Sequence, residues 1–231
     1  LTAKALGVDL LIHYGHSCLI PNDPKSNLKI LYVFVDIKID PLHLIETVKL
    51  NFEKGTKIGL VSTIQFVTTL QSISSVLNQE GYVVNLPQFK PLSPGEILGC
   101  TAPKFQDTNV VIYVGDGRFH LEAAMIANPL LQAYRYDPYE KKFTKEYYDY
   151  KQMCIIRKEA IDRAKLGKSY GLIMGTLGRQ GSEKVVNHLR KRLTCNNKET
   201  VIILLSEIFP DKLRLFEGID AFVQIACPRL S

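Results

Sequence analysis

The runs IGLV at residues 58–61 and YGLIM at residues 170–174 are two apolar segments that share a Gly-Leu pair. Each is followed directly by a polar turn, STIQ at 62–65 and GTLG at 175–178. Segments that are apolar on both faces are typical of strands in a parallel sheet covered by helices. The runs lie about one domain's length apart, and together they predict an α/β fold in which a small unit is repeated.

Outward from these runs, strand-like and helix-like segments alternate along the whole chain. Asp40-Pro41 supplies an acceptor cap and a proline at the first helical position, which predicts a helix with Ile45, Val48 and Phe52 on its buried side. The strands that we expect are residues 8–13, 29–36, 56–61, 109–114, 169–174, 200–205 and 219–225. The fold class is therefore α/β, with repeated small parallel-sheet domains and helices on both faces.

Two further helix starts and the domain division follow from the same patterns. Ser62-x-x-Gln65 and Ser93-x-x-Glu96 have the spacing of capping boxes. The longest helical pattern covers roughly residues 144–165 and is the expected connector between two units. We expect three parts: a remnant of a first α/β domain at 1–54, a second domain at 55–143, and the connector with a truncated third domain at 144–231.

Composition excludes several classes of protein. Of 231 residues, 46% are hydrophobic and 23% charged, which is typical of a globular chain and excludes a disordered or fibrous one. The net charge of +6 is spread along the chain and does not form a nucleic-acid footprint. No apolar run reaches the ~20 residues that span a bilayer, and no signal segment opens the chain. We expect a cytoplasmic protein without membrane or direct nucleic-acid partners.

Both ends of the sequence also carry information. Leu1 stands inside a short helical pattern, and Ser231 follows closely after an apolar strand. We therefore expect this chain to be an internal stretch of a longer protein.

Polar turns follow the expected strands at six places. In parallel α/β sheets, ligands bind beyond the carboxyl ends of strands, where backbone N–H groups are exposed. The glycines of GTLGRQG fit neither the dinucleotide fingerprint nor a phosphate loop, and such glycines also make ordinary tight turns. An α/β enzyme that uses an ordinary nucleotide stays an alternative. The turns are HYGHSC at 13–18, STIQ at 62–65, GDGRFH at 115–120, GTLGRQG at 175–181, SEIFP at 206–210 and ACPR at 226–229.

The five cysteines are irregularly spaced, and no CxxC occurs, which excludes a zinc knuckle and a thioredoxin-like motif. Cys154 and Cys195 lie on helical patterns, and we expect both in the core, as is usual for isolated cysteines. Cys100 and Cys227 stand at the ends of segments in neighbouring units, where thiolates from distant parts of a chain can converge on an iron–sulfur cluster. Spacing alone leaves that hypothesis open against ordinary burial.

Taken together, these motifs closely resemble the 2-(3-amino-3-carboxypropyl)histidine synthase family, which makes diphthamide, and in particular its eukaryotic first subunits. The resemblance extends over essentially the whole chain. It is carried by HYGHSC at 13–18, YVFVD at 32–36, STIQF at 62–66, KPLSPGEILGC at 90–100, GDGRFH at 115–120, YRYDPY at 134–139, GTLGRQG at 175–181, SEIFP at 206–210 and ACPRLS at 226–231.

The resemblance implies three α/β domains of one design around a central four-iron–four-sulfur cluster. Cys100 and Cys227 match the second and third cysteine ligands of the family. The first ligand would lie upstream of Leu1, and Cys18 matches a position that is not a ligand.

The reaction implied by the resemblance is the first step of diphthamide biosynthesis. The 3-amino-3-carboxypropyl group of S-adenosylmethionine would pass to a histidine of elongation factor 2 by iron–sulfur radical chemistry. We expect the turns at 62–65, 115–120 and 175–181 to share one cavity, with Arg179 on the methionyl carboxylate. No residue is evident as a general base. The expected S-adenosylmethionine contacts are Ser62, Thr63, Gln65, Asp116, Gly117, His120, Gly175, Gly178, Arg179 and Gln180.

The resemblance also implies partners for this chain. They are a homologous second subunit that completes a heterodimer, elongation factor 2 as the protein substrate, and a reductant protein. Because the first cysteine ligand is missing from this stretch, a non-catalytic supporting subunit of the same heterodimer stays the alternative. Retention of both Cys100 and Cys227 favours the catalytic interpretation.

Overall fold

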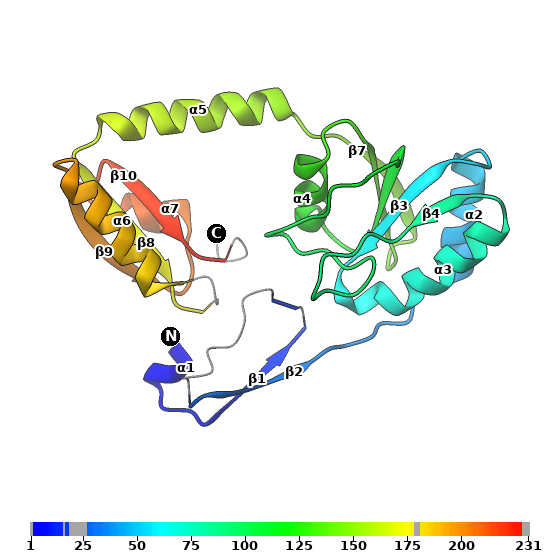
Figure 1. Cartoon of the computed structure of the whole chain (residues 1–231), viewed down its shortest axis with the longest axis horizontal. Helices are drawn as coiled ribbons and strands as arrows, with labels where there is room; N and C mark the ends of the chain where they lie inside the picture. The colour runs from blue at the N-terminus through cyan, green and yellow to red at the C-terminus, as the bar shows by residue number, and fades with distance from the viewer. Residues whose placement is uncertain (1, 16, 19–26, 178–180, 228–231) are drawn as a thin grey trace. The chain divides into compact units, whose positions relative to one another are not determined.

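The computed structural model describes residues 2–15, 17–18, 27–177 and 181–227. They belong to two compact units. The larger unit is formed by Leu10–Pro21 and Lys29–Tyr150, and the smaller by Leu1–Asp9, Asn22–Leu28 and Lys151–Ser231. Both units contain parallel strands and helices, so the predicted α/β class is confirmed (Figure 1).

The larger unit is built on a five-stranded sheet of order β4-β3-β5-β6-β7. The first four strands of that order run parallel, and β7 pairs with β6 in the antiparallel sense. Ser62 lies beside Val114, and Val114 lies beside Tyr136, so that three strands end level at what we call the carboxyl edge. The bounds are β3 (Lys57–Ser62), β4 (Val83–Asn85), β5 (Val110–Val114), β6 (Gln132–Asp137) and β7 (Lys142–Glu146).

Helices cover both faces of this sheet, because successive strand residues point to opposite sides. Ile58 and Leu60 of β3 pack in one core with α2 (Pro41–Asn51) and α3 (Val67–Gln79), which follows the short 3₁₀ helix η1 (Ile64–Phe66). Val61 packs in a second core with α4 (Phe119–Ala127). Strands buried on both sides in this way explain the continuous apolar runs of the sequence.

Helix α2 begins as the sequence predicts. The side chain of Asp40 accepts hydrogen bonds from the N–H groups of Leu42 and His43, and Pro41 occupies the first turn. Ile45 and Val48 are buried.

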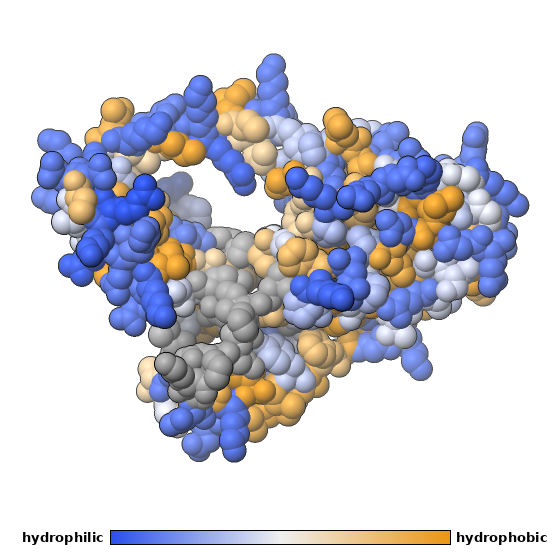
Figure 2. All heavy atoms as spheres, viewed as in Figure 1, coloured by the Kyte–Doolittle hydropathy of each residue, from blue (hydrophilic) through white to orange (hydrophobic). Residues whose placement is uncertain are grey.

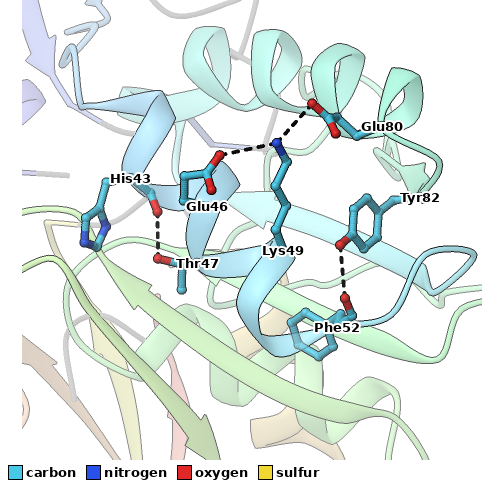
Figure 3. Close-up of polar contacts among 7 residues, drawn as sticks. All are labelled: His43, Glu46, Thr47, Lys49, Phe52, Glu80 and Tyr82. Atoms are coloured by element: carbon cyan, nitrogen blue, oxygen red, sulfur yellow. Dashed lines mark hydrogen bonds and ion pairs between the residues drawn. The ribbon is translucent and has the colours of Figure 1, made fainter.

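Polar contacts join α2 to α3 and to the segment that leads into β4 (Figure 3). Lys49 Nζ lies 3.3 Å from Glu46 Oε1 and 3.0 Å from Glu80 Oε1, and the Tyr82 hydroxyl donates to the Phe52 carbonyl at 3.0 Å. Helix α2 lies within residues 1–54, the stretch predicted as the remnant of a first domain, yet it shares a core with strands β3 and β5 that follow it.

Neither predicted capping box starts a helix with a side-chain cap. Ser62 is the last residue of β3 and its hydroxyl donates to the Thr63 carbonyl, while Thr63 at the start of η1 makes no side-chain cap bond. Glu96 does reach back to the Ser93 N–H at 3.0 Å, as in a capping box. However, Gly95 between them has φ +82°, a left-handed conformation that interrupts a helix, and the segment is a turn.

The smaller unit contains a three-stranded parallel sheet of order β10-β8-β9. Helix α6 (Glu183–Cys195) packs on one face through Val186, and α7 (Pro210–Arg214) packs on the other through Leu213. The strands are β8 (Ser169–Gly175), β9 (Glu199–Leu205) and β10 (Ala221–Ile225), and the short helix α1 (Thr2–Ala5) belongs to the same unit.

The Gly-Leu pair repeated in β3 and β8 has one physical cause. A Cβ at Gly59 would collide with the ring of Phe105, and a Cβ at Gly171 would collide with the ring of Phe222. Each central strand therefore leaves a gap that a phenylalanine fills. The remaining strands of the described chain are β1 (Leu10–Tyr14) and β2 (Lys29–Val33), which form a parallel two-stranded sheet. The division into three domains stays a prediction.

Helix α5 (Tyr150–Leu166) differs from its prediction in two respects. It begins later than residue 144, because residues 142–146 form β7. None of its residues is buried, and Figure 2 shows hydrophobic side chains among hydrophilic ones on its surface. The prediction that Cys154 and Cys195 lie in the core is wrong, because both are exposed. Helix α5 has no fully buried residue, and only Tyr150 at its start packs against a core, while Cys195 is the last residue of α6. No helix in the described part of the chain is long and apolar enough to cross a membrane.

Candidate functional site

Two of the predicted polar turns meet at the carboxyl edge of the larger unit. Ser62 ends β3 and leads through Thr63 to Gln65, while Asp116 and Gly117 follow β5. Because Ser62 and Val114 are register partners, these turns leave the sheet side by side. Ser62 and Thr63 are themselves buried, whereas Asp116 and Gly117 are exposed.

The segment that carries Cys100 joins the same edge. The N–H of Ser62 donates to the Gly95 carbonyl at 2.8 Å, and the N–H of Ile97 donates to the Ser62 carbonyl at 2.9 Å. Residues 95–97 thus run parallel to the end of β3, with Glu96 as the bridge partner of Ser62. Cys100 follows in a turn closed by backbone hydrogen bonds between Leu98 and Thr101, and it is exposed.

A close approach ties the Cys100 turn to α4. A Cβ on residue 99 would overlap the ring of Phe119, the first residue of α4, so only glycine fits there. The Cys100 turn therefore lies against the start of α4 and next to the GDGRFH turn. The edge cluster formed in this way contains Ser62, Thr63, Gln65, Cys100, Asp116, Gly117 and His120.

His120 is held inside the unit by aromatic contacts. Its side chain is 7% exposed and stacks on Tyr113, with ring centroids 6.2 Å apart and an interplanar angle of 19°. Phe119 meets the same imidazole edge-on at 5.3 Å. The geometry fixes the imidazole below the surface of the edge and leaves the exposed positions to Asp116 and Gly117.

Sequence reasoning missed the polar side chains that are buried at this edge. Glu96 is 2% exposed, and its Oε1 has no hydrogen-bond partner in the described structure. Gln65 Oε1 is also buried, and it also has no hydrogen-bond partner in the described structure. The Ser93-x-x-Glu96 spacing predicts a helix start, whereas the bridge between Glu96 and Ser62 cannot be deduced from local spacing.

A second missed contact lies where β6 ends. His43 Nδ1 and the Tyr136 hydroxyl are 2.8 Å apart. Burial raises the pKa of Tyr136 above its usual value, and the nearby negative charges of Asp40 and Asp137 raise it further. Tyr136 is therefore a neutral hydrogen-bonding group at neutral pH.

Part of the predicted site belongs to the smaller unit. Gly175 is buried at the end of β8, and the N–H of the next residue, Thr176, donates to the Leu205 carbonyl at 2.9 Å. Gly178, Arg179 and Gln180 lie outside the described residues. The shared cavity with the turns at 62–65 and 115–120, and the pairing of Arg179 with a carboxylate, stay predictions.

The cysteines fit thiolate ligation, although no complete metal site is assembled among the residues that the structure describes. Cys100 presents an exposed thiol, and Cys227, two residues after β10, is half-buried. Thiolates are the usual ligands of iron–sulfur clusters, so both residues suit such a group. Within the described residues, no three His, Cys, Asp or Glu side chains are grouped closely enough to hold a metal ion.

Comparison with known proteins gives a consistent result. The profile of the family described as "Putative diphthamide synthesis protein" matches residues 1–231. Among curated relatives, 2-(3-amino-3-carboxypropyl)histidine synthase subunit 1 of Nematostella vectensis is 61% identical over 230 residues, which are 100% of this chain and 49% of that protein. The protein of the same name from Homo sapiens is 56% identical and is covered to 53%. The chain thus spans about half the length of the curated relatives that it matches.

Solved structures agree. The crystal structure of Dph2 from Pyrococcus horikoshii superposes with a TM-score of 0.73 at 26% identity, covering 99% of this chain and 66% of that one. The crystal structure of the same protein with a 4Fe-4S cluster gives a TM-score of 0.74, with 67% of that chain covered. Sequence and fold agree along the whole stretch, and the chain belongs to the diphthamide synthesis protein family.

Proposed function

We propose that the full-length protein transfers the 3-amino-3-carboxypropyl group of S-adenosylmethionine to a histidine of translation elongation factor 2. Relatives at 56–61% identity are named 2-(3-amino-3-carboxypropyl)histidine synthase subunit 1, which supports the transferase reaction. The Pyrococcus horikoshii Dph2 structure with a 4Fe-4S cluster supports iron–sulfur chemistry.

One structural observation supports a role for particular residues in this reaction. The exposed thiol of Cys100 lies at the carboxyl edge of a parallel sheet. The segment before it pairs with Ser62, and Gly99 packs against Phe119 at the start of α4. Ligands of parallel α/β sheets bind at this kind of edge. A thiolate there can hold a cluster next to a small molecule bound by the neighbouring turns.

Cys100 and Cys227 would hold the cluster together with a third cysteine from sequence upstream of Leu1. When bound, such a cluster supplies the electron that breaks a carbon–sulfur bond of S-adenosylmethionine. The protein's own part is to bind and orient. Phe119 packed on Gly99 keeps the thiol at a fixed place relative to α4.

The neighbouring turns would bind S-adenosylmethionine. Gly117 has no side chain, so that a ligand can approach its backbone closely, and Asp116 beside it is an exposed acceptor for ligand hydroxyl groups. Arg179 would bind the methionyl carboxylate of S-adenosylmethionine, since a guanidinium pairs with a carboxylate through two parallel hydrogen bonds. In solution these groups would work in a cytoplasmic heterodimer with a homologous second subunit and a reductant protein.

The test is a transfer assay with complete components. The full-length subunit and its partner chain are incubated anaerobically with S-adenosylmethionine, reductant and elongation factor 2, and mass spectrometry follows the aminocarboxypropyl adduct on histidine. We expect the adduct with the wild-type pair and with Cys195→Ser, whose thiol is exposed at the end of α6, but not with Cys100→Ser. An unmodified elongation factor 2 with the wild-type pair would contradict the proposal. If omission of the partner chain left the yield of the adduct unchanged, the proposal that the reaction requires a heterodimer would be wrong.

A further inference from the structure

Glu96 is an acidic side chain buried at the carboxyl edge without a matching cation among the described residues. It is 2% exposed, Oε2 accepts one hydrogen bond from the Ser93 N–H, and Oε1 accepts none in the described structure. The ion pairs within the described part of the chain do not include it. Burying a carboxylate oxygen without a donor costs free energy, so such an atom calls for an explanation.

Strand pairing shows on which side of the sheet this carboxylate lies. Glu96 is the parallel bridge partner of Ser62, and the side chains of adjacent residues on neighbouring strands lie on one side of a sheet. Leu60, two residues before Ser62 and therefore on the same side of the sheet, packs in the core with α3. Ile97, the residue after Glu96, packs with Val61 in the core on the opposite side. Glu96 is therefore on the α3 side, where η1 begins.

Gln65 of η1, three residues after Ser62, supplies a second acceptor near the same strand end. Its Oε1 is buried and likewise lacks a hydrogen-bond donor among the described residues. Its backbone carbonyl accepts from the Ile37 N–H at 2.8 Å, so the position of the residue is fixed by the main chain. Two buried oxygens that need donors thus follow the same strand end, one of them on a carboxylate.

We propose that Glu96 and Gln65 together receive a cationic, N–H-bearing group of the ligand. An ammonium group has three donors and no acceptor, and a hydrogen bond between an ammonium and a carboxylate is among the strong ones. On the proposed function, on which this inference rests, that group is the α-ammonium of S-adenosylmethionine. The ammonium belongs to the part of the molecule that is transferred, so these two residues would orient the transferred group.

Binding measurements separate this role from a structural one. Anaerobic calorimetry on the full-length heterodimer compares S-adenosylmethionine with an analogue in which hydrogen replaces the α-amino group. The wild type should prefer S-adenosylmethionine by about tenfold or more, as expected for a hydrogen bond to a charged group. Glu96→Gln should lose about tenfold in affinity for S-adenosylmethionine and stay within about twofold for the analogue. Glu46→Gln, a matched change on the exposed side of α2, should preserve the preference.

Each outcome decides one question. Equal weakening of both ligands by Glu96→Gln, or an unchanged preference, would overturn the ammonium site while leaving the proposed function intact. A wild type that binds neither ligand would overturn the proposed function and this inference with it. If Glu96→Gln shows no cooperative thermal unfolding, Gln65→Leu takes its place, and an unchanged preference in that variant would equally overturn the inference.

Discussion

At the scale of single residues, the position of the Cys100 thiol depends on its neighbour Gly99. The Phe119 ring occupies the space that any other side chain at residue 99 would need. Backbone hydrogen bonds between Leu98 and Thr101 close the turn around the cysteine. In its proposed role as a cluster ligand, Cys100 would have to stay within about 0.5 Å of its place, and this packing supplies that constraint.

We predict that Gly99→Ala destabilises the protein by about 1–3 kcal/mol, because the added methyl group overpacks the contact with Phe119. Urea denaturation of the full-length subunit should show a lower midpoint. As a control, Phe119→Leu in the same chain removes part of the ring and should restore some of the loss in the double variant. A single variant as stable as the wild type, or a double variant whose losses simply add, would contradict the overlap.

At the scale of elements, the strands were the predictable part of the fold. Strands β3, β5 and β8 are buried on both faces, and such strands leave continuous apolar runs that can be identified without a structure. The cap of α2 was equally local, because Asp40 and Pro41 act within one turn.

Other elements depended on distant contacts and were missed. Strand β6 contains Arg135, whose side chain is ion-paired with Asp137 and with Glu146 of β7, so that a charged residue is tolerated in the sheet. The helix expected from residue 144 begins later, because Lys142–Glu146 form β7 and pair with β6 in the antiparallel sense. The Ser93–Glu96 spacing suited a helix start, but the backbone of Ser62 paired with residues 95–97 instead.

Asp220 gives a pH-dependent prediction for the smaller unit. Its carboxylate accepts from the N–H groups of Lys168 at 2.7 Å and Ser169 at 2.9 Å, and so it joins the start of β8 to the segment before β10. The hydrogen bond from Ser169, followed by that from Lys168, lowers the pKa of Asp220 below its usual value. A lowered folded-state pKa means that the stabilisation is present at neutral pH and is lost as the pH falls below about 4 and through the folded pKa.

We therefore expect Asp220→Asn to have a lower melting temperature at pH 7 and a smaller further decrease between pH 7 and pH 3 than the wild type. Circular dichroism melts over that range measure both quantities. Asp162→Asn, a change in an exposed ion pair of α5, serves as the control and should follow the wild-type curve. A variant that keeps the wild-type decrease on acidification would show that Asp220 has no such role.

At the scale of the whole molecule, the sequence predicted which turns of the larger unit belong together, but it did not identify every polar group in them. The turns at 62–65 and 115–120 meet because parallel strands end at one edge, which is a general property of the fold class. Glu96 was missed as a site residue, because its burial arises from a bridge to Ser62 that is not encoded in local spacing. The exposure of Cys154 and Cys195 could not be deduced either, since the usual burial of cysteine does not apply to a helix without buried residues or to a helix end.

We propose that Cys100 and Cys227 hold the iron–sulfur cluster on which the transfer depends. The most direct measurement is the iron content and the ~400 nm absorbance of the anaerobically reconstituted full-length subunit, since thiolate ligation produces both. We predict that Cys100→Ser and Cys227→Ser lose most of both signals, while Cys154→Ser and Cys195→Ser keep wild-type values. Wild-type iron and absorbance in Cys100→Ser or Cys227→Ser would contradict the claim.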